Sequence, residues 1–165
     1  MKYLFTVSEA NELYTIGWGV YATQDIPEGE LVVNLLKGCR WRNAPTRTSI
    51  QLGEKHMESA VGGFVNHHCE PNAKVLLAVM SFNGEINLVP PFVKVKGTLS
   101  SIIFASPTPW IVSTRFIEEG EQIFIDYNDT EDKLANPFEC NCHGRKIVGK
   151  HEMQIMEYED GESRI

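Results

Sequence analysis

Short apolar runs rich in Val, Ile, Phe and Tyr recur along the chain, and turn-forming residues separate them. Runs of this length that are bounded by Gly, Pro, Asn and Asp are typical of β-strands. The pattern therefore predicts strands at residues 19–24, 30–36, 73–82, 101–105, 111–114 and 121–127.

Turn and helix signals complete this picture. Asn83-Gly84 lies between two apolar runs, and because both residues tolerate positive φ it predicts a β-hairpin. Helical spacing is found near Glu54 to Ala60 and in the tail from His151 to Tyr158, where each helix would be short. The sequence thus predicts a mostly β fold with few short helices.

Length and composition indicate one globular domain. The chain has 165 residues, of which 42% are hydrophobic and 22% charged. No apolar run approaches the roughly 18 residues that a membrane-spanning helix needs, and the N-terminus lacks the apolar core of a signal peptide. We therefore expect no membrane association and an intracellular location, cytoplasmic or nuclear.

Charge and cysteine content narrow the class of partner. The net charge of −7 argues against direct nucleic-acid binding, which needs a basic stripe, and favours a basic protein or peptide, or a cationic amine. Four cysteines occur, and Cys140-x-Cys142 is too closely spaced for the disulfide framework of a secreted domain. Metal binding or simple burial of reduced thiols is the expected use.

Two segments in the first half of the chain combine turn-forming and polar residues. Gly17-Trp18-Gly19 alone indicates only a tight turn entering a strand, since it lacks the third glycine and the helix of a dinucleotide-binding motif. Asn66-His67-His68-Cys69-Glu70-Pro71-Asn72 cannot form a regular helix or a central strand, because Pro71 interrupts both. A surface loop is the plain interpretation, but polar residues directly after apolar Phe64-Val65 favour a site.

Two further segments lie near the C-terminus. Gly120 to Tyr127 predicts a turn followed by a strand, and Tyr127 alone would be an ordinary half-buried aromatic residue. In Pro137-Phe138-Glu139-Cys140-Asn141-Cys142, the cysteines are either half of a metal site or two reduced thiols in a loop.

Together these segments resemble the SET-domain family of S-adenosylmethionine-dependent protein-lysine methyltransferases. Gly17-Trp18-Gly19 resembles the family's Gly-x-Gly segment, and residues 66–72 resemble its Asn-His-Ser-Cys-x-Pro-Asn motif. Residues 120–127 resemble its Gly-Glu-Glu-Leu…Asp-Tyr motif, and Cys140-x-Cys142 the start of the post-SET segment. The order of the motifs matches from about Gly17 to Gly149, and the chain is most similar to small stand-alone SET proteins.

The resemblance implies a fold and a domain organisation. A SET-domain fold consists of several small curved sheets with a knot-like C-terminal threading, an exception to the usual avoidance of threaded chains. We expect the SET domain to occupy residues 1–135. Residues 136–165 would form a degenerate post-SET segment and an acidic tail.

The resemblance also implies site residues. The backbone of Gly17, Trp18 and Gly19 would contact the methionine part of S-adenosylmethionine, and Asn66 would bind its polar end. The His67 backbone would meet the adenine edge, and Phe138 would cover the adenine. Tyr127 would bind the cofactor and act as the catalytic residue, because its hydroxyl can orient the methyl group through weak C–H···O contacts.

Methyl transfer by this route is chiefly a problem of positioning. The acceptor lysine, whose free pKa is near 10.4, must lose its proton before it attacks. A narrow apolar channel beside a cationic sulfonium would lower that pKa, so no dedicated general base is required.

The zinc motif of the family is incomplete in this chain. The family's post-SET zinc uses a cysteine of the Asn-His motif and Cys-x-Cys-x4-Cys, but Ile147 stands at the last position. Cys69, Cys140 and Cys142 remain as candidate zinc ligands, and a closed zinc site needs four. His143 or His151 would be the fourth, with strained geometry, so we assign no complete metal site from the sequence.

The leading hypothesis is methylation of a lysine amine of a protein. Methylation of a small amine or metabolite is a second hypothesis, and a catalytically decayed SET-like module for cofactor binding or interaction is a third. Asn66, His67 and Tyr127 favour the two hypotheses in which the protein is an active enzyme. The missing post-SET cysteine favours the small-amine or metabolite hypothesis and the decayed-module hypothesis over a protein acceptor.

Overall fold

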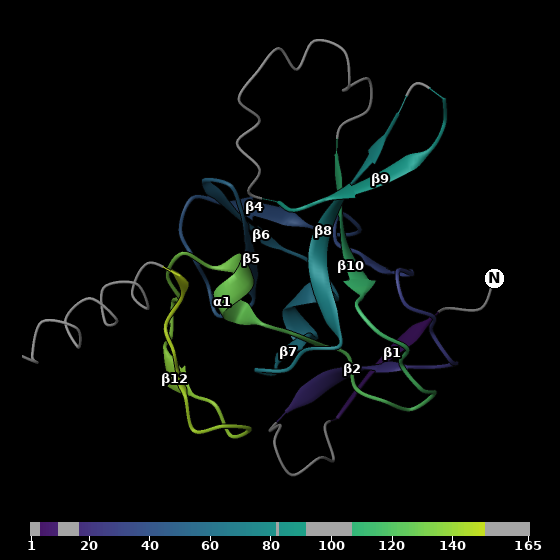
Figure 1. Cartoon of the computed structure of the whole chain (residues 1–165). Coiled ribbons are helices and arrows are strands. Elements are labelled where there is room, and N and C mark those ends of the chain that lie inside the picture. Colours follow the sequence, from purple (N-terminus) through teal and green to yellow (C-terminus); the bar gives the residue numbers. More distant parts are fainter. Residues whose placement is uncertain (1–3, 10–16, 82, 92–106, 151–165) are drawn as a thin grey trace, which may run out of the picture.

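The computed structural model describes residues 4–9, 17–81, 83–91 and 107–150, and these form several small β-sheets (Figure 1). The largest is antiparallel, with strand order β3-β10-β8-β9. Its strands are β3 (Leu31–Asn34), β10 (Thr108–Ser113), β8 (Ala73–Met80) and β9 (Ile86–Val89). Figure 1 shows β8 and β10 in the middle of the molecule.

The other sheets surround this one and are shorter. A three-stranded antiparallel sheet has the order β4-β6-β5, and three pairs are formed by β1 with β2, β7 with β11, and β12 with β13. The strands are β1 (Phe5–Glu9), β2 (Trp18–Ala22), β4 (Arg40–Arg42), β5 (Ser49–Leu52), β6 (Lys55–Glu58), β7 (Asn66–His67), β11 (Phe124–Ile125), β12 (Phe138–Glu139) and β13 (Lys146–Ile147).

Helical structure is limited to two short elements in the described residues. One is a 3-10 turn, η1 (Gly62–Phe64), and the other is α1 (Tyr127–Thr130), which Asp126 caps by accepting a hydrogen bond from the Asn128 backbone N–H. None of the described helices is long and apolar enough to cross a membrane. The prediction of a mostly β fold with several small sheets is therefore confirmed.

The predicted strands at 19–24, 30–36, 73–82 and 111–114 correspond to β2, β3, β8 and β10. The predicted hairpin at Asn83-Gly84 joins β8 to β9, with Gly84 at a φ of 83° and Met80 opposite Ile86. The predicted strand at 121–127 is reduced to β11. The predictions for 101–105 and for the helix from His151 to Tyr158 lie outside the described residues.

The predicted helix from Glu54 to Ala60 is wrong, because residues 55–58 form strand β6. Gly53, at a φ of 66°, turns the chain so that β6 pairs with β5, and β4 pairs with the other edge of β6. His56 and Met57 are both buried. The hydrogen bonds on both edges of β6 stabilise the strand more than an isolated helix of fewer than two turns would be stabilised.

The main core lies where the sheets meet. It is built almost wholly from β-branched and aliphatic side chains, as the apolar runs require. Its fully buried members include Val20, Ile26, Val33, Leu35, Met57, Val65, Ile111, Ile117, Ile123 and Ile125.

Asn72 is a buried polar residue that joins the segment after β7 to the segment before β11. It is 1% exposed, and its side-chain nitrogen donates to the Glu121 carboxylate and to the Gln122 carbonyl. Its side-chain oxygen accepts from the Phe124 N–H at 2.8 Å. This one amide therefore fixes the entry of the chain into β11.

We predict that Asn72→Ala lowers the free energy of unfolding by about 2–4 kcal/mol, because buried donors and acceptors lose their partner. Asn87→Ala, on the exposed strand β9, is the matched control and should change stability by about 0.5 kcal/mol or less. Urea unfolding of both variants measures the difference. Equal stabilities of the two variants would contradict the role of Asn72.

Candidate functional site

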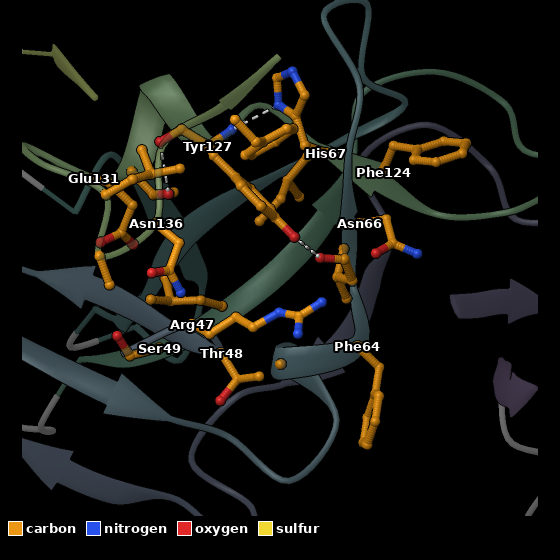
Figure 2. Close-up of a pocket in the computed structure, with 18 of the residues that line it drawn as sticks. Arg47, Thr48, Ser49, Phe64, Asn66, His67, Phe124, Tyr127, Glu131 and Asn136 are labelled. Atoms are coloured by element: carbon orange, nitrogen blue, oxygen red, sulfur yellow. Dashed lines mark hydrogen bonds between the residues drawn. The ribbon is translucent and has the colours of Figure 1, made fainter. Parts of the chain in front are cut away.

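A pocket of about 750 Å³ brings together segments that are distant in sequence (Figure 2). It is lined by parts of residues 17–18, 46–50, 62–68 and 124–142. Of the predicted site residues, the pocket is lined by Gly17, Trp18, Asn66, His67, Tyr127 and Phe138.

Gly19, which was also predicted to contact the cofactor, is not among the lining residues. A Cβ atom at Gly19 would come within 2.4 Å of the Gln122 side-chain nitrogen, and Gln122 is fully buried. Packing against Gln122 therefore requires glycine at this position. A backbone contact between Gly19 and the cofactor stays a prediction.

Parallel pairing of β7 with β11 positions the aromatic centre of the pocket. Phe124 lies opposite Asn66 and Ile125 opposite His67, so the chain delivers Tyr127 directly beside residues 65–67. The Tyr127 hydroxyl donates a hydrogen bond of 2.8 Å to the Val65 carbonyl (Figure 2). This hydrogen bond fixes the phenol beside Val65 in the pocket.

The Tyr127 hydroxyl keeps its proton at neutral pH. Burial raises the pKa of Tyr127 to about 12, since a phenolate would be desolvated. With its proton directed at Val65, the oxygen still has lone pairs to accept weak contacts. The neutral phenol can therefore accept weak contacts, and at neutral pH no phenolate is available to act as a base.

Asn66 ties the Gly-Trp-Gly segment to the same pocket. Its side-chain nitrogen donates to the Trp18 carbonyl at 3.0 Å. Trp18 is 57% exposed, and Gly17 has a φ of 105°, which favours glycine. The two sequence motifs thus meet at one edge of the pocket.

The His67 imidazole is directed away from solvent, with its side chain 2% exposed. Its Nδ1 accepts from the Tyr127 backbone N–H at 3.2 Å and lies 3.4 Å from a carboxylate oxygen of Asp126. Its ring is 5.4 Å from that of Tyr127 and 5.7 Å from that of Phe138. Burial lowers the pKa of His67 to about 4, so the ring is neutral at physiological pH.

His67 also belongs to a cluster with three thiols. One ligand atom from each of His67, Cys69, Cys140 and Cys142 lies within 4.8 Å of the others. Cys69 Sγ is 3.4 Å from Cys140 Sγ and 3.5 Å from His67 Nε2, and all four cysteines of the chain are free. The donor set of three sulfurs and one imidazole is one that structural zinc sites use.

This cluster corrects the prediction that His143 or His151 is the fourth ligand, because His67 takes that place. His143 is not a member, because its Nε2 lies 3.7 Å from Glu70 and its ring is beside His68. His151 lies outside the described residues. His67 precedes Cys69 by two residues, and side chains at i and i+2 of an extended segment share a face. The i, i+2 spacing of His67 and Cys69 was therefore a signal in the sequence that His67 could be the fourth ligand.

Ile147, at the position of the missing cysteine, serves packing instead. It is 1% exposed in a small second core with Leu134 and Cys140, against which Tyr127 also packs. The β12-β13 hairpin is closed by the Cys140 N–H donating to the Arg145 carbonyl at 2.8 Å. Apolar burial thus holds the hairpin at the position where the family motif places a thiolate.

A buried polar network at the wall of the pocket was not predicted from the sequence. Glu131 accepts from the Gln51 backbone N–H at 2.6 Å, and its other oxygen is 3.5 Å from His56 Nδ1. The Gln51 side chain both donates to Asp132 and accepts from its N–H. These contacts fasten the C-terminal end of α1 to β5 and so support Tyr127, whose carbonyl accepts from the Glu131 N–H.

Arg47 is a second lining residue that the motifs did not indicate. Figure 2 shows its side chain reaching across the pocket to a position below the Tyr127 hydroxyl, on the side of Asn66. The positive charge of Arg47 acts on Tyr127 to lower its pKa, against the larger effect of burial. No pattern of spacing marks this arginine, because a loop before β5 places it.

Comparison with known proteins agrees with this geometry. The SET domain family model matches residues 17–128. Histone-lysine N-methyltransferase EHMT1 of Homo sapiens and that of Mus musculus are each 32% identical to the chain over 149 residues. The match covers 79% of this chain and 10% of each relative, so the chain spans about a tenth of their length.

A solved structure supports the fold. The crystal structure of KRYPTONITE in complex with mCHG DNA and SAH gives a TM-score of 0.55 at 17% sequence identity. The superposition covers 84% of this chain and 27% of that chain.

The Glu131 network predicts a pH-dependent contribution to stability. Burial raises the pKa of Glu131 from 4.5 to about 7, so the folded state holds this proton more tightly than the unfolded chain. The stabilisation is complete below pH 4.5 and is lost as pH rises through 7. Between pH 5 and 8 the free energy of unfolding of the wild type should therefore fall by about 2–3 kcal/mol relative to that of Glu131→Gln, which cannot ionise at this position.

The measurement is the free energy of unfolding of both proteins across this range. Comparing them isolates Glu131 from His56 and His67, whose pKa values burial lowers and which therefore act in the opposite direction. A stability difference that does not change with pH would show that Glu131 ionises equally in both states.

Proposed function

Because this chain belongs to the SET-domain family, we propose that it is an S-adenosylmethionine-dependent methyltransferase acting on a lysine amine of a protein. One observation carries the proposal: the Asn66-His67 segment, the Gly17-Trp18 turn and the Tyr127 phenol line one pocket. A single bound cofactor can reach all three.

The cofactor residues are proposed from their positions in this pocket. The backbone of Gly17 and Trp18, with Gly19 behind them, would face the methionine part of the cofactor. Asn66 would hydrogen-bond the polar end of that part. The His67 backbone would meet the adenine edge, and Phe138, 37% exposed at the rim, would cover the ring. The pocket's size suits a ligand of this kind, since ligand pockets are typically about 300–1,000 Å³.

S-adenosylmethionine supplies an electrophilic methyl group on a sulfonium. Tyr127 would orient that methyl group, because its oxygen is fixed by the hydrogen bond to Val65 and retains lone pairs for C–H···O contacts. The acceptor amine must arrive neutral, and burial beside a positive charge favours its neutral form. The residues thus act by positioning, without a general base.

The acceptor is proposed to be a basic protein segment inside the cell. The net charge of −7 attracts cationic partners, and the unpaired cysteines fit a reducing compartment. The curated relatives are described as histone-lysine N-methyltransferases, which supports a protein lysine as acceptor.

A small amine is the second candidate, and one observation favours it. The wall of the pocket near Tyr127 carries polar side chains in addition to apolar ones, and these include Arg47, Thr48, Ser49, Glu131 and Asn136 (Figure 2). A polar wall suits an acceptor with polar groups close to its amine.

We also propose that His67, Cys69, Cys140 and Cys142 bind one structural zinc ion. Coordination through His67 Nε2 would require the ring proton on Nδ1, which would then donate to the Asp126 carboxylate 3.4 Å away instead of accepting from the Tyr127 backbone N–H. A carboxylate in this position fixes the orientation of a metal-bound histidine. The ion would join residues 67–69 to the hairpin of residues 138–147, on which Phe138 lies.

Tyr127→Phe is expected to lower the rate of methyl transfer on the order of 100-fold, because the methyl group loses its orienting oxygen. Cofactor affinity should remain nearly unchanged. Transfer of labelled methyl from S-adenosylmethionine to a panel of basic proteins, peptides and small amines measures the rate, and calorimetry measures the affinity.

Tyr21→Phe is the matched control for this variant. The Tyr21 hydroxyl is also hydrogen-bonded, to Gln122, but Tyr21 does not line the pocket. Methyl transfer that survives Tyr127→Phe undiminished would contradict the role of Tyr127. Cofactor binding by the wild type without transfer to any acceptor would instead support the non-catalytic module.

For the metal, elemental analysis of the purified protein should find one zinc ion per chain. His67→Ala should weaken zinc binding roughly 10–100-fold in a chelator competition, a loss typical of damage to a metal site. His68→Ala is the control, because this neighbouring ring contacts the Glu70 backbone instead of the thiols. Equal zinc affinities of the two variants would contradict ligation by His67.

A further inference from the structure

Arg47 places a permanent positive charge in the pocket. Among the described lining residues it is the only arginine or lysine. Within the described part of the chain, no hydrogen bond or ion pair joins it to a carboxylate. Its positive charge acts on the Tyr127 phenol, and Figure 2 shows its guanidinium below that hydroxyl.

The segment that carries Arg47 is held in place by side-chain contacts. The Thr46 backbone N–H donates to the Ser49 hydroxyl at 2.9 Å, and the Thr46 hydroxyl donates to Glu58 at 2.9 Å. On its other side the segment packs against the η1 turn, where a Cβ at Gly63 would come within 2.9 Å of Thr48. Arg47 therefore enters the pocket from a fixed loop.

The carboxylates of the pocket do not neutralise this charge. Glu131 is directed to Gln51 and His56 behind the wall, and burial raises its pKa to about 7. Glu139 also lines the pocket but is exposed on β12. An arginine that faces a ligand pocket without an internal anion is suited to an anionic group of the ligand.

We propose, on the basis of the proposed function, that Arg47 binds the α-carboxylate of the cofactor's methionine part. Figure 2 shows Arg47 reaching toward the Asn66 side of the pocket. The Asn66 side chain in turn donates to the Trp18 carbonyl, in the turn where that part of the cofactor is proposed to bind. The planar guanidinium can hold a carboxylate through two parallel hydrogen bonds. Arg47 would thus fix the end of the cofactor opposite to the adenine.

The test compares two ligands that differ in this carboxylate. S-adenosylhomocysteine carries the amino-acid part, whereas 5′-methylthioadenosine lacks it. Measured by calorimetry, Arg47→Ala should weaken the affinity for S-adenosylhomocysteine about 10–100-fold and leave the affinity for 5′-methylthioadenosine within about twofold of that of the wild type. The affinity of Arg47→Lys for S-adenosylhomocysteine should lie between those of the wild type and Arg47→Ala, because an ammonium keeps the charge without the paired hydrogen bonds.

Arg40→Ala is the matched control, since Arg40 is exposed on β4 and outside the pocket, and it should change neither affinity. Equal weakening of both ligands by Arg47→Ala, or no weakening of either, would overturn the assignment. Unchanged affinities for both ligands together with lost methyl transfer would also overturn the assignment, and would indicate that Arg47 contacts the acceptor instead of the cofactor. Failure of the wild type to bind S-adenosylhomocysteine would instead overturn the proposed function.

Discussion

The parallel pairing of two-residue strands β7 and β11 is the constraint on which the site depends. So short a pair is weak alone, because two residues offer few ladder hydrogen bonds. It is reinforced by the buried Asn72 amide, which accepts from the Phe124 N–H, and by His67, which accepts from the Tyr127 N–H. Side chains that hydrogen-bond to backbone therefore set the register, and the register sets where the phenol lies.

This arrangement links the two hydrophobic cores. Tyr127 packs against both the main core and the small core of Leu134, Cys140 and Ile147. The Glu131 network then holds the end of α1 on β5. Among the proposed cofactor and metal ligands, the rings of His67 and Phe138 lie beside that of Tyr127, and the three thiols belong to the small core against which Tyr127 packs.

Local patterns predicted part of this structure. β2, β3, β8 and β10 follow from apolar runs between turns, and the Asn-His-x-Cys-x-Pro-Asn segment together with Tyr127 indicated the family and the pocket. What the sequence missed depends on tertiary contacts. β6 is a strand because it is paired on both edges. The positions of the His67 imidazole beside the thiols and of Arg47 in the pocket depend on which distant segments face them.

The double position of His67 has a thermodynamic consequence. Its imidazole faces the thiols while its backbone belongs to the strand that borders the pocket. If an ion and a nucleoside ligand both occupy these places, linkage requires that each change the other's affinity by the same factor. An ion that strengthens binding of the ligand would therefore itself be bound more tightly, at equilibrium, while the ligand is present.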